Sequence, residues 1–448
     1  MRRSYCRSTP RTSVGTYFLQ YDDIGKVAML NPRLDLSGGV WRWSVVIGAG
    51  IFATTLAQSD TLDLPLRNLL TSKFQVLQLD PCVEATGALH TISQFFGVVA
   101  LPWYFKFIVG VFSDSIPLLG TMRRHYVLLS ATAAAALWFL AGQMQHSYLS
   151  LLAVITAMET MLVVCSTVMG ALLVEVGQRL DAAGHLVAAR IFVEGICAVI
   201  AGPLVGVLAG VPFGIAATVG AIVAFTVVPI AFIWLNEPAT AKYQVSAIVD
   251  VKDELRRIIR SRALWLAAGF IFVASMPQIF PTPLWNFQKC DMRLSDPTIG
   301  YLRAAGGVGS ILAAMIYALI YRWTSLRSLI ALGIVGSSFG SFSYVFYYSV
   351  PAAFVIETAN GFLTTFWVLA MMEMAVWVAP KAAEAAAFAL LMGAHNLGTA
   401  VGDYLFSDLV DWSMLGFSGI AAVSAVGTFL MIIFLRFLPN DLFGPAER

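Results

Sequence analysis

Apolar stretches of about 20 residues alternate with short polar segments along most of the 448-residue chain. A helix of that length rises about 1.5 Å per residue and so crosses a hydrocarbon layer of about 30 Å. The first group of apolar windows covers residues 41–58, 92–113, 125–142, 147–172, 187–209 and 211–235, and the second covers residues 262–281, 299–321, 327–347, 351–379, 384–407 and 415–438. The pattern predicts twelve transmembrane helices in two groups of six.

A charged segment, residues 236–261, separates the two groups of predicted helices. It mixes Lys and Arg with Asp and Glu, as a helix lying on the membrane surface does. Residues 59–91, between the first two spans, are too charged to cross the membrane and are expected to form an external amphipathic helix. We therefore expect a cytoplasmic tail at 1–40, a six-helix bundle at 41–235, a cytoplasmic linker at 236–261, a second six-helix bundle at 262–438 and a cytoplasmic tail at 439–448.

The composition agrees with this pattern, because 58% of the residues are hydrophobic and only 12% are charged. Soluble globular domains carry about 25% charged residues. The net charge is only +2, and the Lys and Arg residues lie between the predicted spans, which excludes nucleic acid as a partner. The sequence therefore predicts an all-α integral membrane protein surrounded by membrane lipid.

The sequence contains no motif for ATP binding, metal binding or covalent catalysis. It has no GxxxxGK[ST] phosphate loop, no HExxH motif and no clustered metal ligands. It also lacks a paired nucleophile and base at helical spacing, which an intramembrane enzyme would need. We therefore expect that the protein is not an enzyme and that it binds no cofactor or metal.

Most of the 28 Lys and Arg residues lie on one side of the membrane if the N-terminus is cytoplasmic. Cytoplasmic loops carry this excess, so both termini are predicted to face the cytoplasm. The alternative is an odd number of spans, with the termini on opposite sides, which would make half of the chain break the rule. Cys82 and Cys290 are predicted to lie on the same, outer side of the membrane. The sequence allows two alternatives for them, a disulfide or two free thiols.

The expected location is the plasma membrane. The stretch 2–13 is rich in Arg, Ser and Thr and free of acids, which is also typical of a transit peptide. A plastid or mitochondrial membrane therefore stays open as the alternative.

The densest group of polar residues joins the second and third predicted spans and reads PWYFKFIVGVFSDSIPLLGTMRRHY. In this stretch a glycine allows a neighbouring helix to approach, an acid at the end of a span faces two arginines, and Pro117 with the next glycine forces a tight loop. Such charges can hold one conformation closed and release it when the helices move. The gating residues expected here are Gly110, Asp114, Gly120, Arg123 and Arg124. The alternative is a basic anchor that only fixes topology.

This segment resembles the signature of the folate-biopterin transporter family, a branch of the major facilitator superfamily. Residues 171–175 and 380–396 are similar to two further family motifs, which contain Glu175 and Glu384. Gly170 is a departure, because the family usually has an acidic residue at that position. The resemblance implies a major-facilitator fold of two six-helix bundles and transport of folates or pterins, often with protons. Glu175 and Glu384 complete the expected gating residues.

The resemblance implies an anionic substrate with a flat bicyclic ring, and residues in the spans offer partners for both parts. Cations inside the membrane are costly unless they are paired or wetted. The candidates for the substrate carboxylates are Lys106, Arg190 and Arg303. Aromatic and amide side chains suit the ring. The candidates for the ring are Trp103, Trp367, Asn360 and Asn396. Arg190 and Arg303 are alternatively end-of-helix residues that extend towards water.

Proton coupling requires a carboxylate inside the membrane. The candidates are Glu159, Glu194 and Glu357. Each is alternatively a structural partner, and Glu194 lies one turn after Arg190, where an i,i+4 ion pair would neutralise both. We interpret His395 as a hydrogen-bonded packing residue rather than a proton relay.

The sequence therefore predicts a secondary transporter of folate or pterin solutes that works by alternating access and is coupled to protons. Its expected partners are a small-molecule substrate, protons and membrane lipid. Two alternatives stay open, since one fold hosts many substrates. One is a carrier of another small organic solute, and the other is a transporter-like sensor that binds a ligand without moving it.

Overall fold

The computed structural model describes most of the two predicted bundles. The described residues are 39–58, 62–73, 82, 88–145, 147–179, 183–235, 237, 256, 258–278, 280–321, 323–378, 384–412 and 415–443. Almost all of the predicted N-terminal tail, most of the predicted linker at 236–261 and part of the predicted C-terminal tail lie outside these residues.

The first half of the chain forms six membrane-crossing segments and one short helix between the first two of them. The segments are α1 (Gly39–Leu56), α3 to α5 (Ala88–Val99, Leu101–Tyr104 and Lys106–Ser115), α6 (Arg124–Gln143), α7 (Tyr148–Arg179), α8 (Ala183–Leu208), and α9 with α10 (Phe213–Phe225 and Val227–Trp234). The short helix is α2 (Asp63–Lys73).

Two of these segments are broken helices, and each break lies close to a proline. Pro102 follows the break at Ala100, and Pro229 follows the break at Thr226. Proline has no N–H to donate to the preceding turn, and its ring clashes with the carbonyl there. A further break at Phe105 places Lys106 at the first position of α5.

The second half repeats this arrangement with six further segments. They are α12 with α13 (Arg262–Ser275 and Pro281–Asn286), α14 (Asp296–Ile320), α15 (Leu326–Ser343), α16 (Val350–Val378), α17 (Glu384–Trp412) and α18 (Gly416–Phe437). Short turns of helix follow at η1 (Phe287–Asp291), η2 (Tyr344–Phe346) and η3 (Asn440–Phe443). Three starts carry a serine cap, since Ser261, Ser295 and Ser325 each accept a hydrogen bond from the backbone N–H three residues on.

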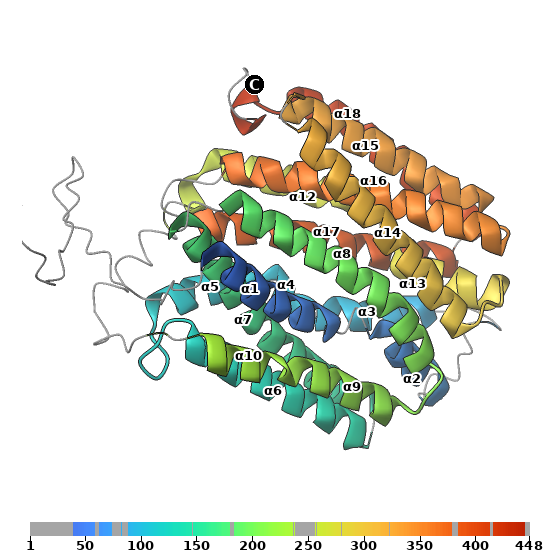
Figure 1. Ribbon diagram of the computed structural model, residues 1–448. Coiled ribbons are helices and arrows are strands. Elements are labelled where there is room, and N and C mark those ends of the chain that lie inside the picture. The colour runs from blue at the N-terminus through green and yellow to red at the C-terminus, as the bar shows by residue number, and fades with distance from the viewer. Residues whose placement is uncertain are drawn as a thin grey trace, which may run out of the picture.

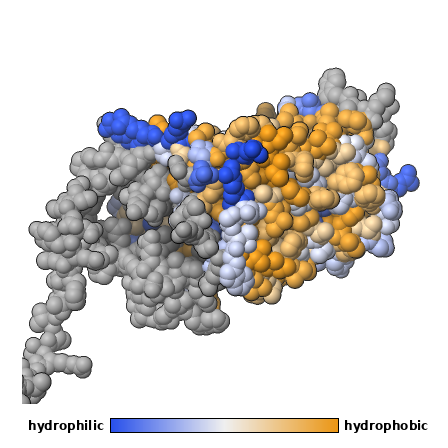
Figure 2. Space-filling view, turned by 90° about the horizontal axis from the view of Figure 1, so that it is seen from above, coloured by the Kyte–Doolittle hydropathy of each residue, from blue (hydrophilic) through white to orange (hydrophobic). Residues whose placement is uncertain are grey.

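Every predicted span coincides with one of these helices or broken helices, so the prediction of twelve transmembrane helices is confirmed. Seven of the described helices are individually long and apolar enough to cross a membrane, and four shorter apolar helices accompany them. Figure 2 shows apolar side chains covering most of the coloured surface on the side of the second half. Exposed residues on α15 and α18 include Leu332, Phe339, Phe429, Ile433 and Phe434. Lipid is the solvent that such a surface requires.

The two halves meet along α8 and α14 and along the segments α3 to α5 and α17. In Figure 1, α8, α14 and α17 lie between α12, α15, α16 and α18 on one side and α6, α9 and α10 on the other. Glycines bring the backbones of α8 and α14 together, because a Cβ at Gly206 would stand 2.7 Å from the carbonyl oxygen of Asp296. Gly202 of α8 and Gly300 of α14 approach in the same way.

α2 lies at one end of this assembly, together with α13, η1 and the first turn of α14 (Figure 1, right). We call this the α2 end. Its position agrees with the prediction of a helix between the first two spans that does not cross the membrane.

Candidate functional site

Five of the predicted site residues gather where the two halves face each other, and we call them the central cluster: Trp103, Lys106, Glu159, Arg190 and Glu194. Lys106 lies with its ammonium nitrogen 5.9 Å from the centre of the Trp103 ring. It also interacts electrostatically with Arg190 and Glu194 of α8. Residues of α4, α5, α7 and α8 thus form one group of charges against an aromatic ring.

Glu159 of α7 anchors the aromatic ring of this cluster. The indole Nε1–H of Trp103 donates a hydrogen bond of 2.7 Å to Oε2 of Glu159. Glu159 is only 1% exposed. A hydrogen bond to an ionised acceptor is stronger than a neutral one, so the protonation state of Glu159 bears on how firmly the ring is held.

Arg190 and Glu194 form the i,i+4 ion pair that their spacing allowed, with Nε and Oε1 2.9 Å apart. Their side chains are 31% and 33% exposed. On the facing helix, a Cβ at Gly170 would lie 3.9 Å from Nη1 of Arg190. Glu194 thus contacts Nε of the guanidinium, and Nη1 lies towards Gly170.

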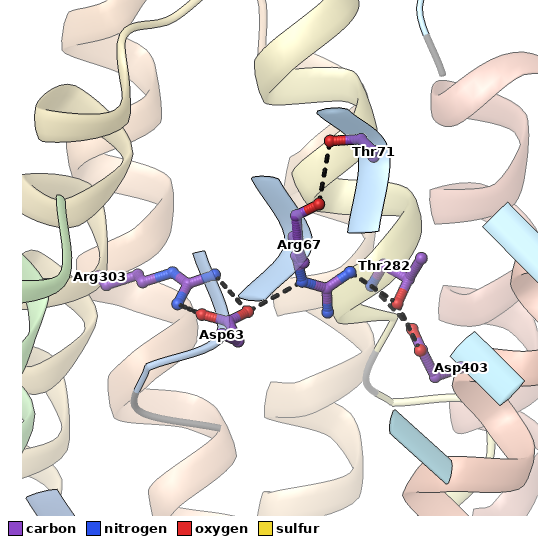
Figure 3. Close-up of polar contacts among 6 residues, drawn as sticks. All are labelled: Asp63, Arg67, Thr71, Thr282, Arg303 and Asp403. Carbon is purple, nitrogen blue, oxygen red and sulfur yellow. Dashed lines mark hydrogen bonds and ion pairs between the residues drawn. The ribbon is translucent and has the colours of Figure 1, made fainter. Parts of the chain in front are cut away.

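Arg303, the third predicted cation, lies outside the central cluster. Its guanidinium holds the carboxylate of Asp63 through two contacts, Nη1 to Oδ1 and Nη2 to Oδ2, the second at 2.9 Å (Figure 3). Asp63 begins α2, whereas Arg303 lies in α14, so this ion pair joins the two halves. Burial alone would raise the pKa of the Asp63 carboxyl, but the guanidinium groups of Arg303 and Arg67 more than offset it and hold that pKa below its ordinary value.

The contacts of Asp63 continue across the α2 end. Arg67 donates to Asp63 at 2.9 Å and to the hydroxyl of Thr282 at 3.0 Å. Thr282 in turn donates its hydroxyl and its backbone N–H to Asp403, at 2.7 and 2.8 Å (Figure 3). Arg67 is 3% exposed, with its guanidinium over the rings of Phe96 and Trp285. Arg67, Thr282 and Asp403 are buried, whereas the side chain of Arg303 is 32% exposed, much like that of Arg190.

Other contacts between the halves flank this chain. Asn68 of α2 donates at 2.9 Å to Asp296, which also pairs with Lys289. His90 of α3 lies 3.2 Å from Asp408 of α17. A disulfide joins Cys82 to Cys290, so of the two alternatives for these cysteines the structure has the bonded one.

Glu357, the third predicted proton carrier, lies in the second half near the α2 end. It accepts hydrogen bonds from Tyr347 at 2.8 Å and from Gln288 at 3.2 Å, with the hydroxyl of Tyr344 at 3.5 Å. Arg303 is the cation that acts on it electrostatically. Glu357 is thus placed beside the partner of Asp63 rather than beside Lys106.

The remaining predicted ring partners have contacts within the second half. Asn360 donates to Ser343 at 3.2 Å and to the carbonyl of Ile356 at 3.0 Å. Trp367 is 1% exposed in the apolar core. The carbonyl of Asn396 accepts from Thr399 at 2.8 Å. The next residue back, His395, contacts Ser275 at 2.8 Å, as a packing histidine does, and interacts electrostatically with Lys106.

The predicted gating loop forms a tight two-residue turn. Leu119 and Gly120 both have positive φ, 49° and 85°, between the mutually hydrogen-bonded Leu118 and Thr121. That conformation favours glycine. A Cβ atom placed at Gly110 would lie 3.7 Å from the side chain of Thr167, which is an ordinary van der Waals distance.

The two arginines of this loop lie in the first half. Arg123 donates to Ser113 at 3.3 Å, and Arg124 donates to the carbonyl of Phe232 at 3.1 Å. Glu237 accepts from the backbone N–H groups of residues 122–124 and so caps α6. The side chains of Asp114, Glu175 and Glu384 lie outside the described part of the structure.

Sequence reasoning missed Asp63, Arg67, Thr282 and Glu237. Asp63 and Arg67 have the i,i+4 spacing of an ion pair, so their contact with each other could have been predicted from the sequence. Their contacts with residues of the second half could not, because no local pattern indicates them. Among the described residues, no three His, Cys, Asp or Glu side chains are placed to hold a metal ion.

The fold has solved relatives. It is similar to the structure of the nucleoside transporter NupG, with a TM-score of 0.62 and 14% identity over 88% of this chain and 99% of that one. It is similar to a D-xylose-proton symporter with a TM-score of 0.65 and 12% identity, over 89% of this chain and 98% of that one. The two six-helix halves, with polar residues between them, thus have the fold of these two transporters.

The chain belongs to the BT1 family, whose pattern matches residues 84–442. It is 24% identical over 415 residues to the folate-biopterin transporter of Synechocystis sp., a match that covers 84% of this chain and 79% of that protein. The relatives found are transporters and not enzymes.

Proposed function

We propose that this protein transports folate or pterin solutes across the membrane by alternating access, with a proton as the coupling ion. The observation that carries the proposal is the central cluster, in which Lys106 and Arg190 face one carboxylate, Glu194. If Glu159 is protonated, the cluster keeps one positive charge. A carboxylate of the solute would neutralise that charge, and the ring of Trp103 offers a surface for the flat bicyclic part.

The absence of a side chain at Gly170 supports this assignment. A cation that is fully paired within the protein has nothing left for a ligand, whereas Arg190 uses Nε for Glu194 and has Nη1 towards Gly170, which offers no carboxylate. We infer that a carboxylate of the substrate enters at this point. The Synechocystis relative carries folate and biopterin in its name, which points to the same class of solute.

We propose two carboxylates as the groups that respond to a proton. Glu159 holds Trp103, so protonation there acts on the ring that faces the substrate. Glu357 lies beside Arg303, so protonation there acts on the contacts of the α2 end. Glu194 already serves Arg190 as an ion-pair partner. We propose Glu159 as the acid that couples to substrate binding and Glu357 as the acid that couples to opening of the α2 end.

We also propose that both termini face the cytoplasm and that the α2 end faces outwards. The Cys82–Cys290 disulfide lies at the α2 end. Disulfides persist on the oxidising side of a membrane, which supports this orientation.

The test is uptake of labelled folate and biopterin by transport-deficient cells that express this chain, at two external pH values and beside a vector control. Saturable uptake that rises at acid pH is the expected result. Absence of both uptakes, from protein shown to be at the membrane, would favour a carrier of another organic solute. Specific binding without uptake would favour a sensor.

A further inference from the structure

Helix α2 has two faces with different chemistry. One is apolar: Leu66, Leu69 and Leu70 are buried in a cluster that includes Phe95 and Trp138 of the first half and Trp285 and Ile299 of the second. Leu62, just before the helix, would lie 2.8 Å from a Cβ at Gly220 of α9. This face ties α2 mainly to the first half.

The other face is polar and reaches the second half. Asp63 pairs with Arg303 of α14, Arg67 donates to Thr282 of α13, and Asn68 donates to Asp296. Arg67 is also held within α2 by Asp63. Every one of these bonds between the halves joins groups that water can solvate.

The two faces respond differently when the halves separate. Moving the leucines out of their cluster would expose apolar surface to water, which is unfavourable in proportion to the area. Separating Asp63 from Arg303 lets water replace the lost partner, and the Asp63–Arg67 pair stays within the helix. α2 therefore stays with the first half, and the polar contacts are the ones that open.

We propose that α2 is the gate of the α2 end and that Asp63 and Arg67 are positioning residues of the transport cycle, closing it by binding Arg303 and Thr282 of the second half. This rests on the proposed alternating access. The gate is closed in the structure, where Thr282 accepts a hydrogen bond from Arg67 and donates one to Asp403.

Opening the gate does not leave Arg303 without an anion. Glu357 lies within electrostatic range of Arg303, held by Tyr347 and Gln288. An unpaired cation in a low-dielectric region is strongly unfavourable. Arg303 therefore exchanges one carboxylate for another, Asp63 when the gate is shut and Glu357 when it is open, and the cost of opening stays small.

The test measures access to the seam behind the gate. Ala198 of α8 faces Gly307 of α14, with 3.0 Å between the Ala198 Cβ and a Cβ placed at Gly307. In intact cells, Ala198→Cys is exposed to a membrane-impermeant maleimide and its labelled peptide is measured by mass spectrometry. Adding Asp63→Asn is expected to speed labelling about tenfold, since an ion pair between the halves is lost.

Thr71→Ala is the matched control on α2, because the hydroxyl of Thr71 bonds only carbonyls of its own helix. Its labelling rate is expected to equal that of the parent. Equal rates for Asp63→Asn and the parent would overturn the proposal, as would an equal rise in Thr71→Ala. If Asp63→Asn does not fold, Thr282→Val removes the hydroxyl between Arg67 and Asp403 at nearly constant volume. Faster labelling then supports the gate, and an unchanged rate overturns it.

Labelling needs no known substrate, so the gate and the solute are tested separately. Faster labelling of Asp63→Asn, together with no uptake of folate or biopterin by the parent, would support the gate and count against the proposed solute.

Discussion

A Cβ atom added at Gly170 would lie 3.9 Å from Nη1 of Arg190, on the side of the guanidinium that Glu194 does not occupy. The residue at position 170 thus decides whether Arg190 meets a second carboxylate of the protein.

The first prediction concerns this position. Gly170→Asp is expected to weaken folate uptake about tenfold, because the new carboxylate occupies the space beside Arg190 and offsets its charge. Uptake of biopterin, which has no carboxylate, is expected to change less. Gly170→Asn has the same size without the charge and is the control. Equal losses in both variants would assign the effect to bulk and not to charge.

The second prediction concerns Lys106. Lys106→Ala is expected to raise the folate concentration needed for half-maximal uptake about tenfold or more while leaving surface abundance unchanged. The change removes one of the two cations of the central cluster. Lys106→Arg keeps the charge and is expected to recover most of the affinity. Normal affinity in the alanine variant would remove Lys106 from the site.

The third prediction separates the ring of Trp103 from its hydrogen bond. Trp103→Phe keeps an aromatic surface but loses the Nε1–H that donates to Glu159. If Glu159 carries the coupling proton, this change shifts the pH dependence of uptake and leaves saturable uptake intact. Glu159→Gln is expected to abolish the pH dependence. A pH profile identical to that of the parent in both variants would transfer the role to another acid.

The fourth prediction tests packing between α14 and α16. A Cβ at Gly309 would stand 2.7 Å from the backbone nitrogen of Phe362, which is too close for any side chain. Gly309→Ala is therefore expected to destabilise the protein by about 2 kcal/mol or more. Gly269→Ala is the control, since nothing lies within 4 Å of its Cβ position. It is expected to stabilise its helix by about 0.5–1 kcal/mol. Thermal unfolding in detergent measures both.

The fifth prediction concerns the disulfide at the α2 end. In intact cells, a membrane-impermeant reductant followed by an impermeant maleimide is expected to label Cys82 and Cys290, and neither thiol should react before reduction. Cys82→Ser leaves Cys290 reactive without reductant and serves as the control. Labelling that requires permeabilised cells would place the α2 end inside and reverse the proposed orientation.

The sequence predicts the helices well because each span must be apolar over its whole length. The breaks within the spans at 92–113 and 211–235 were not predicted, although Pro102 and Pro229 lie beside them. The sequence also predicts that α2 stays out of the membrane. These properties depend only on the residues within each segment, so a hydropathy profile predicts them.

The sequence predicts contacts between helices less completely. It grouped Lys106, Arg190 and Arg303 as cations in the spans, and nothing local shows that Arg303 alone meets a carboxylate 240 residues away. Glu159 and Trp103 are 56 residues apart and belong to different helices, so their hydrogen bond could not be predicted from the sequence either. The ion pair between Arg190 and Glu194 can be predicted, because a spacing of four residues places two side chains next to each other on a helix.

The order in which the chain is synthesised gives the Asp63–Arg67 ion pair a second role, during membrane insertion. Arg67 leaves the ribosome 215 residues before Thr282, and Asp63 leaves it 240 residues before Arg303. At about 5–20 residues per second, α2 waits on the order of 10–50 s for its partners. During that time its leucines can already pack on the first half, while Asp63 and Arg67 neutralise each other 2.9 Å apart. This pair therefore keeps the waiting helix from presenting two unmatched charges to the membrane until the second half has been inserted.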